Sequence, residues 1–463
     1  MAARRTRSGT GSDSRDGAPA PAARADLARV QAVLADTWRR EAALIVATVA
    51  RMVRDIGLAE DLAQDALLAA LDTWPRDGLP DRPAAWLTTT ARNRALDLLR
   101  RDTVLAAKLV QIGADLQARE ALTVPDFVDA LDDARADAFG DDMLRLVFTA
   151  CHPLLSPDAR SALTLKCVAG LSTEEIARAF LSSEATVAQR IVRAKRTLAE
   201  AGVPFEMPQG AALRERLASV LEVVYLLFNA GYSAVRGPAL LRGDLVHEAL
   251  RLSGLLARHL DDAAAGPDAA EVQALDALLA LQASRSAARV DTAGQPVLLA
   301  EQDRSRWDGV LIQRGLAALQ RATVWGAAHD QPAGPYALQA AIAACHARAA
   351  TAASTDWAHI AQLYDRLLAV QPSPVVALNR AVAVGLAQGP AAALPLMQAL
   401  LAEPALRDYP WLASAMADLL ARLGRHGEAE AGFRHAATLT ANQAEQALLL
   451  RRADEQQRLG RPA

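Results

Sequence analysis

The chain has 463 residues, 52% of them hydrophobic but only 4% aromatic, and a formal net charge of −3 at pH 7. This length exceeds what one hydrophobic core usually holds, so several domains are expected. The slightly negative charge excludes a uniformly basic protein that coats nucleic acid, although it is compatible with a local basic face. Three cysteines without regular spacing indicate a reducing compartment, and no apolar run is long enough to span a membrane. We therefore expect a cytoplasmic protein with no membrane partner.

Much of the apolar content is alanine, the residue with the highest helix propensity, and the prolines cluster at segment edges. An all-α protein is the predicted fold class. Residues 1–25 are rich in Arg, Ser, Gly and Ala and have no apolar stretch, so we expect a disordered tail there.

Helical periodicity runs from about residue 27 to residue 71. Within it, Asp61, Gln64 and Asp65 lie on adjacent faces of one helix around an apolar stripe. An acidic and amide patch of this kind suits a basic helical partner. Any solvated helix can carry such a patch, so the pattern alone leaves both interpretations open.

A turn dense in helix breakers, Trp74–Pro83, separates this segment from a second helix at Ala84–Arg101. That helix combines an aromatic residue, hydroxyls, an amide and basic residues, a combination that can hold single-stranded DNA. Alternatively, Trp86 belongs to the core and the basic face is only solvated. Residues 103–140 follow as an acidic linker with some helix.

Residues 141–202 contain the helix start signals that are typical of a helix-turn-helix. Ser156 and Pro157 begin a helix, and Ser172 with Glu175 forms a capping box before the next one. A further helix should bury Val187, Ile191, Ala194 and Leu198, and its other faces are basic, which matches the docking of a recognition helix on duplex DNA. The alternative is a helical hairpin with a solvated basic face. Leu181 stands in the turn where this motif commonly has glycine.

Amphipathic helices are expected over a middle segment, residues 203–330, with one short hairpin around Asp291–Gly294. In residues 331–463, two helix-pair units align when shifted by about 34 residues, the tetratricopeptide period, so that Leu378 matches Leu412. The helices 336–349 and 357–370 look like an earlier pair, and residues 442–457 would cap the stack.

Other chemistry finds less support in the pattern. Cys151 and His152 with Cys167 lack a fourth zinc ligand, so a packed core is favoured over a metal site, and Cys345 with His346 is interpreted in the same way. The polar residues from Arg285 to Asp308 fit a structural salt-bridge cluster better than a ligand pocket. The sequence contains no glycine-rich phosphate-binding motif, and its spacing indicates no pair of catalytic nucleophile and base. We expect no enzyme, no cofactor and no metal.

Taken together and in this order, the acidic patch, the breaker-rich turn, the Trp86 helix and the helix-turn-helix resemble the extracytoplasmic-function RNA polymerase σ factors of the σ-70 family. The resemblance implies that residues 26–102 are σ region 2 and residues 141–202 are σ region 4. It further implies that Asp61, Gln64 and Asp65 bind the clamp helices of the polymerase β′ subunit. The β subunit and promoter DNA are the other implied partners.

The same resemblance implies two sets of DNA-binding residues. Those for the −10 element, in the turn and the helix after it, are Asp81, Arg82, Trp86, Arg92, Asn93, Arg94 and Arg100. Those for the −35 element, in the recognition helix of region 4, are Ser183, Glu184, Thr186, Gln189, Arg190, Arg193 and Arg196.

The predicted function is that of a σ factor, which binds core polymerase, directs it to a promoter and helps to open the duplex. The remainder resembles the subgroup with a long tetratricopeptide-like C-terminal extension, which would regulate activity and offer the repeats to a protein partner. The alternative is a conventional helix-turn-helix regulator with a repeat-based sensor. Such a regulator would not need the acidic patch followed by the Trp86 helix.

Overall fold

Helices make up nearly all the regular structure of the computed structural model, which describes residues 21–112, 135–180, 182–232, 243–260, 266–292 and 295–460. Within these ranges the one β pairing is an isolated bridge between Val290 and Pro296, so the all-α class is confirmed and the expected hairpin is reduced to that bridge. Among the same residues, no helix is both long and apolar enough to cross a bilayer. Leu181, residues 1–20 of the expected tail and residues 113–134 of the expected linker lie outside the described residues.

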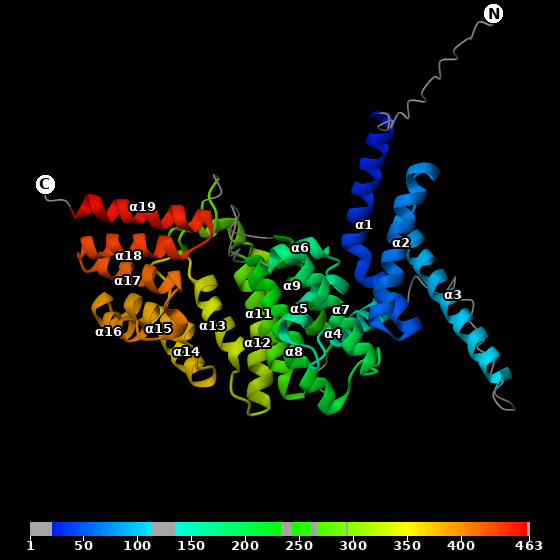
Figure 1. The fold of residues 1–463 in the computed structure, drawn as a ribbon. Helices are drawn as coiled ribbons and strands as arrows, with labels where there is room; N and C mark the ends of the chain where they lie inside the picture. The colour runs from blue at the N-terminus through cyan, green and yellow to red at the C-terminus, as the bar shows by residue number, and fades with distance from the viewer. Residues whose placement is uncertain are drawn as a thin grey trace, which may run out of the picture.

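Three helices form an N-terminal unit at one end of the molecule (Figure 1). They are α1 (Pro21–Val53), α2 (Ile56–Asp77) and α3 (Pro83–Ile112). The chain breaks between α1 and α2 because Arg54 has a positive φ of 56° and the Asp55 carboxylate caps α2, accepting hydrogen bonds from the N–H groups of Gly57 (2.7 Å) and Leu58 (3.0 Å). Aliphatic side chains at helical spacing then pack α1 against α2 and α3.

Two helix boundaries differ from the prediction. α2 continues through Pro75 to Asp77, because Trp74 is buried (2% exposed) and its packing holds the last turn despite the hydrogen bond that proline cannot donate. The helix ends at Gly78, whose φ of 92° favours glycine. α3 runs beyond Arg101 into the expected linker, since no breaker interrupts the sequence before Gly113.

The helix-turn-helix unit follows, and its capping signals agree with the prediction, although its first helix already begins at Arg135 in the expected linker. Its helices are α4 (Arg135–Ala150), α5 (Pro157–Cys167), α6 (Thr173–Ala179) and α7 (Glu184–Glu200). Ser156 caps α5, and the capping box is present: the Glu175 N–H donates to Ser172 Oγ (3.1 Å) and the Ser172 N–H donates to Glu175 Oε2 (2.8 Å). The four residues of α7 expected in the core, Val187, Ile191, Ala194 and Leu198, are all buried.

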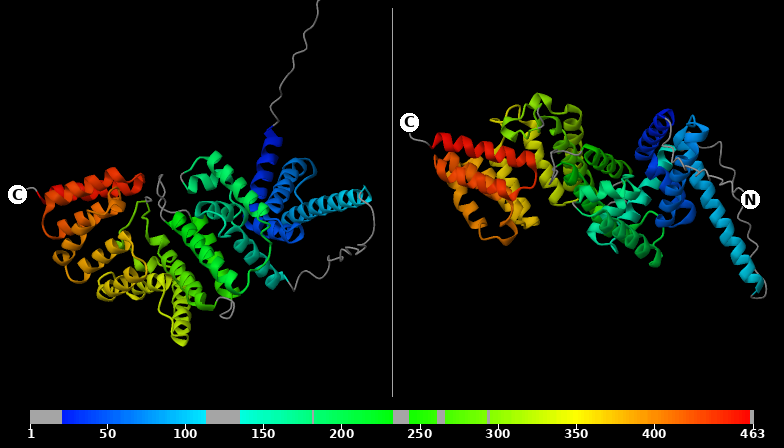
Figure 2. Two further views of the ribbon diagram at one scale, coloured as in Figure 1. Left: turned by 60° about the horizontal axis from the view of Figure 1, so that its bottom comes forward. Right: turned by 45° about the horizontal axis from the view of Figure 1, so that its top comes forward.

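The second half of the chain consists of a middle unit and a repeat unit. The middle unit contains α8 (Gly210–Tyr232), α9 (Gly243–His259), α11 (Ala269–Ala283) and α12 (Gly309–Ala328). The repeat unit contains α13 (Pro335–Arg348), α14 (Trp357–Val370), α15 (Pro374–Ala387), α16 (Pro390–Leu400), α17 (Pro410–Arg422), α18 (His426–Leu439) and α19 (Gln443–Leu459). Leu378 and Leu412, matched by the repeat, are both buried in the first helix of a pair. Figures 1 and 2 show the pairs stacked away from the N-terminal unit.

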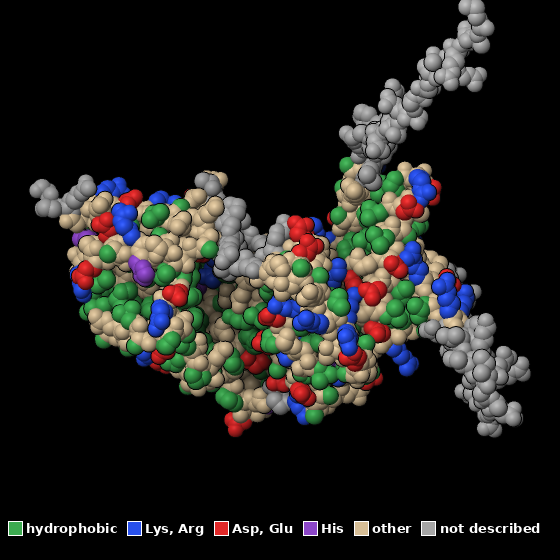
Figure 3. Space-filling model, in the orientation of Figure 1, with side chains coloured by type: hydrophobic (Ala, Val, Ile, Leu, Met, Phe, Trp, Pro, Cys, Tyr) green, Lys and Arg blue, Asp and Glu red, His purple; other side chains and the backbone are tan. Residues whose placement is uncertain are grey.

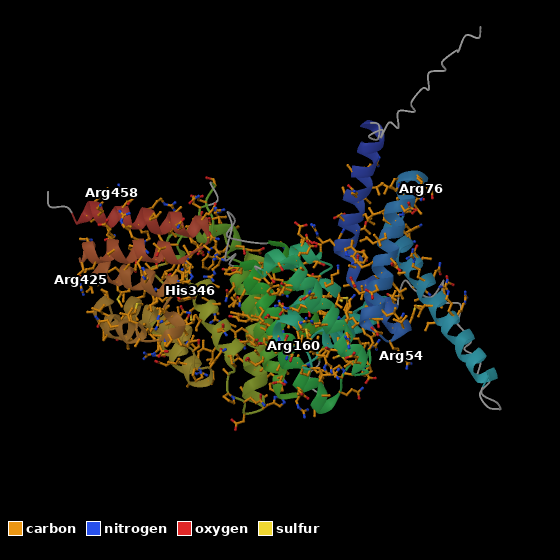
Figure 4. All side chains as sticks on the ribbon, in the orientation of Figure 1. Arg54, Arg76, Arg160, His346, Arg425 and Arg458 are labelled. Carbon is orange, nitrogen blue, oxygen red and sulfur yellow. The ribbon has the colours of Figure 1, made fainter. Side chains whose placement is uncertain are left out.

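One hydrophobic core joins units that the sequence suggested were separate. The cluster of buried residues extends without a break from Val30 in α1 to Ala283 in α11, through the helix-turn-helix unit. Arg160 of α5 links this unit to α8, because its Nη1 donates to Ser219 Oγ (2.9 Å) and lies 3.5 Å from the Glu222 carboxylate. Figure 4 labels Arg160 in the centre of the molecule. The helix-turn-helix unit is therefore held between the N-terminal and middle units.

Candidate nucleic-acid and partner interface

An exposed face of α2 carries the three residues predicted to bind a protein partner. The Asp61 and Asp65 side chains are 69% and 54% exposed, and Gln64 is half-buried between them. Leu68 lies one turn further along and is 61% exposed, although it is large and apolar. Its spacing from Asp61 and Asp65 puts it on the same helical face. Sequence reasoning missed Leu68, and the signal that could have found it is an apolar residue outside the buried stripe.

The polar side chains of α3 either flank its buried face or lie opposite it. Ala91 and Ala95 are buried at helical spacing, whereas Asn93 and Arg100 are exposed and Arg92 and Arg94 are half-buried. Arg94 Nη1 lies 3.2 Å from Asp65 Oδ2 of α2, so the predicted DNA-binding set and the predicted partner-binding set touch.

The start of α3 shows how Trp86 packs. Its ring is half-buried and packs edge-on against Trp74 of α2, with centroids 5.5 Å apart and planes at 74°. The ring therefore serves the core, with one side still accessible. Asp81 and Arg82 are exposed in the short turn before it.

The N-terminal half of α7 is open on its outer face. Glu184, Thr186, Gln189 and Arg193 are exposed there. Ser183 and Thr186 also have a local role, because Ser183 Oγ accepts from the Thr186 N–H (3.1 Å) and lies 2.7 Å from its hydroxyl. Ser183 is thus the N-cap of α7, and it satisfies the N–H group of Thr186 in the first turn.

The basic face of α7 is partly paired within its own unit. Arg190 Nη2 lies 3.1 Å from Asp158 of α5, and Arg196 Nε lies 2.6 Å from Glu200. Val192, which sequence reasoning missed, is a large apolar residue of this helix and is 63% exposed. On the face shown in Figure 3, acidic and basic side chains are interspersed where the N-terminal and helix-turn-helix units meet.

One cation of α7 turns away from the open face and onto α2. Lys195 Nζ donates to Asp61 Oδ1 (2.8 Å) and to the Glu60 carboxylate, which Lys166 of α5 approaches at 3.6 Å. Burial alone would lower the pKa of Lys195, but the two carboxylates raise it above its usual value. Glu60 is only 3% exposed. Its sequence context resembles a solvated acid, so no local signal identifies this contact.

Two of the three cysteines are core residues, and Cys345 is half-buried. Cys151 and Cys167 are buried, and Cys151 Sγ lies 3.3 Å from Thr164 Oγ1. Burial raises the pKa of the Cys151 thiol to about 12 and that of Cys167 further, so both stay protonated. Over the part of the chain that the structure describes, no cluster of three or more His, Cys, Asp or Glu residues could hold a metal ion.

Two arginines between residues 285 and 308 make tertiary contacts, Arg304 to the repeat unit and Arg289 within the middle unit. Arg304 Nη1 donates to the carbonyls of Ala349 (2.7 Å) and His346, and Arg289 lies over the Tyr232 ring, 4.0 Å from its centroid. Figure 4 labels His346 at this junction. These contacts support the structural interpretation, but through carbonyl groups and a ring rather than through the predicted salt bridges.

Known protein families match three segments of the chain. The Sigma-70 region 2 family matches residues 37–104, and the Sigma-70, region 4 family matches residues 145–198. A family of unknown function, DUF6596, matches residues 216–323. Yeast Tom70 aligns with 94% of this chain and 86% of its own at a TM-score of 0.30 and 11% identity, which is too low to support the fold.

Three curated proteins show where sequence similarity lies. An uncharacterized protein of Rhizobium meliloti is 44% identical over 407 residues, which cover 87% of this chain and 91% of that protein. RNA polymerase sigma factor CarQ of Myxococcus xanthus is 34% identical over 141 residues, 30% of this chain and 72% of CarQ. ECF RNA polymerase sigma factor SigK of Mycobacterium tuberculosis is 28% identical over 173 residues, 36% of this chain and 84% of SigK.

Proposed function

Because this chain belongs to the RNA polymerase σ factors of the extracytoplasmic-function type, we propose that it binds core RNA polymerase through α2 and directs it to promoters through α3 and α7. In this assignment the N-terminal unit is σ region 2 and the helix-turn-helix unit is σ region 4. The observation that carries the proposal is the face of α2 formed by Asp61, Gln64, Asp65 and Leu68, which we call the α2 docking face.

The α2 docking face suits a helical partner with basic side chains, as the clamp helices of β′ would be. Two exposed carboxylates flank an amide, and Leu68 supplies an apolar contact on the same side. Charges steer the encounter and select the partner, whereas burial of an apolar anchor contributes affinity. Because Leu68 shares a helical face with the two carboxylates, a helical partner that pairs with the acids would also bury this side chain.

Two further surfaces would recognise the promoter, one on α3 for the −10 element and one on α7 for the −35 element. On α3, Arg92, Asn93, Arg94 and Arg100, with Asp81, Arg82 and the accessible side of Trp86, would hold the single-stranded −10 element. On α7, the helix N-terminus would face base edges and the arginines would face phosphates of the −35 duplex. The residues of this surface are Ser183, Glu184, Thr186, Gln189, Arg190, Arg193 and Arg196.

The C-terminal half would regulate this activity through the packing of α8 and α9 against the helix-turn-helix unit. The shared core and the Arg160 contacts tie the position of α5 to that of α8. A protein that binds the repeat unit, which extends away in Figures 1 and 2, could therefore influence region 4 through the middle unit.

Permanganate footprinting on a promoter fragment tests the proposal, because permanganate oxidises thymines only where the strands have separated. Core polymerase with this protein should make thymines of the −10 element reactive, and core polymerase alone should not. Duplex binding by the protein without reactive thymines would favour a conventional helix-turn-helix regulator instead.

A further inference from the structure

The contact between α7 and α2 joins two surfaces that the proposed function assigns to different partners. Lys195 lies on the recognition helix, and Asp61 lies on the α2 docking face, yet Lys195 Nζ donates to Asp61 Oδ1 at 2.8 Å. The same ammonium donates to Glu60, whose side chain is 4% exposed. The Lys195 side chain is only 15% exposed, so its ion pair with Glu60 is shielded from water, whereas the Asp61 side chain stays 69% exposed. A polymerase that uses Asp61 has to compete with Lys195 for it.

Glu60 strengthens the contact between α2 and the helix-turn-helix unit, because it pairs with two lysines of that unit. One of its oxygens faces Lys195 of α7 and the other lies 3.6 Å from Lys166 of α5, too far for a hydrogen bond but close enough for an ion pair. Both lysines come from the helix-turn-helix unit and the carboxylate comes from the N-terminal unit. A carboxylate buried between two cations of another unit is stable only while that unit is docked, because either cation's departure leaves it poorly compensated.

Close packing around the ion pair shows that the two units fit each other. A β-carbon built on Gly57 of α2 would lie 3.1 Å from Lys195 Cβ, and one built on Gly170 would lie 2.9 Å from Ala42 Cβ of α1. Arg51 of α1 adds a second ion pair across the boundary, 3.2 Å from the Asp142 carboxylate. The docked arrangement is thus a defined interface, held by both apolar and charged contacts.

We propose that Lys195 is an intramolecular latch, which in the free protein holds region 4 against α2 through Glu60 and Asp61 and thereby competes with core RNA polymerase for the α2 docking face. This inference rests on the proposed function and adds a mode of regulation to it. The latched protein keeps Asp65 and Leu68 exposed and Gln64 half-buried between them, so polymerase can begin to dock. A basic helix arriving there would replace Lys195 at Asp61 and release α7.

Disulfide trapping in the full chain tests the latch. In the variant with Gly57→Cys and Lys195→Cys, the two β-carbons lie near the 3.5–4.5 Å of a disulfide and need only a small adjustment. Oxidation should join the two introduced thiols within one chain, each thiol losing a proton and the pair giving two electrons to the added oxidant. Wild-type protein and the two single variants, treated identically, control for Cys167 and the other native thiols.

The readout is the affinity for core polymerase, measured with and without dithiothreitol. The reduced double variant should bind, and the oxidised one should bind at least about tenfold more weakly, as expected when the competent conformation is scarce. Equal affinity in both states, or failure of the cross-link to form, would overturn the latch alone. A reduced protein that does not bind core polymerase would instead overturn the proposed function.

A second variant tests the latch without a cross-link. Lys195→Gln removes the charge that holds Asp61 and Glu60, so it should bind core polymerase about five- to tenfold more tightly than wild type, at the lower end of usual coupling between sites. Thr197→Ala, an exposed neighbour on α7, is the matched control and should bind as wild type does. Unchanged or weaker binding by Lys195→Gln in a protein with wild-type helicity would overturn the latch.

Discussion

Replacing Leu68 by alanine should weaken binding to core polymerase while leaving the fold intact. The side chain is 61% exposed, so its truncation should change the free energy of unfolding by less than about 0.5 kcal/mol. Full burial of a leucine side chain stabilises a complex by about 1.5–3 kcal/mol, and roughly the exposed part remains to be buried on docking. The expected loss is therefore about 1–2 kcal/mol, which corresponds to a Kd about 5- to 30-fold higher.

Fluorescence anisotropy of labelled full-length protein, titrated with core polymerase, measures this difference. Leu459→Ala is the matched control, because Leu459 is also exposed (58%) but lies at the far end of α19. Urea unfolding of both variants checks that the fold is kept. Equal affinities for wild type and Leu68→Ala would refute the assignment of Leu68 to the α2 docking face.

Three further predictions concern DNA binding and stability. Arg190→Ala should weaken binding to −35 duplex by about 1–3 kcal/mol if the side chain reads a base, and wild-type affinity with an unchanged salt slope in gel-shift titrations would remove it from the site. Asp276→Ala should lower the free energy of unfolding by about 3 kcal/mol, because this buried carboxylate (2% exposed) pairs with Arg314. A loss below about 0.5 kcal/mol in urea unfolding would count against that contribution. Burial and two nearby arginines lower the pKa of His346 from 6.5 to about 4. The unfolded chain therefore binds a proton at a higher pH than the folded protein does. The free energy of unfolding keeps its full His346 contribution above pH 6.5 and loses about 3 kcal/mol as the pH falls towards 4. The stability of His346→Gln, followed by urea unfolding from pH 8 to 4, should fall less steeply than that of wild type, and parallel curves would contradict this.

Local chemistry made much of the helix-turn-helix unit predictable. A capping box needs only Ser172 and Glu175 three residues apart, and the buried stripe of α7 needs only apolar residues at helical spacing. Both features depend on neighbours in the chain, which a sequence displays directly. The exposure of Leu68 could have been found in the same way, by asking which apolar residue falls outside the stripe.

Contacts between distant segments could not be predicted from periodicity. Glu60 and Lys195 are far apart in the sequence, and each looks like a solvated side chain of an amphipathic helix. Pro75 is read locally as a helix breaker, and only the burial of Trp74 shows why α2 continues past it. The shared core of three units likewise depends on how the helices meet, which spacing along one helix does not encode.

Run-off transcription with purified core RNA polymerase tests σ activity most directly. Templates carrying candidate promoters should yield transcripts of defined length only when this protein is added, and the charge-reversed variant with Asp61→Lys and Asp65→Lys should yield far fewer. Core polymerase that stays silent with the protein on every template, while the protein still shifts duplex DNA, would contradict the assignment of σ activity to this chain.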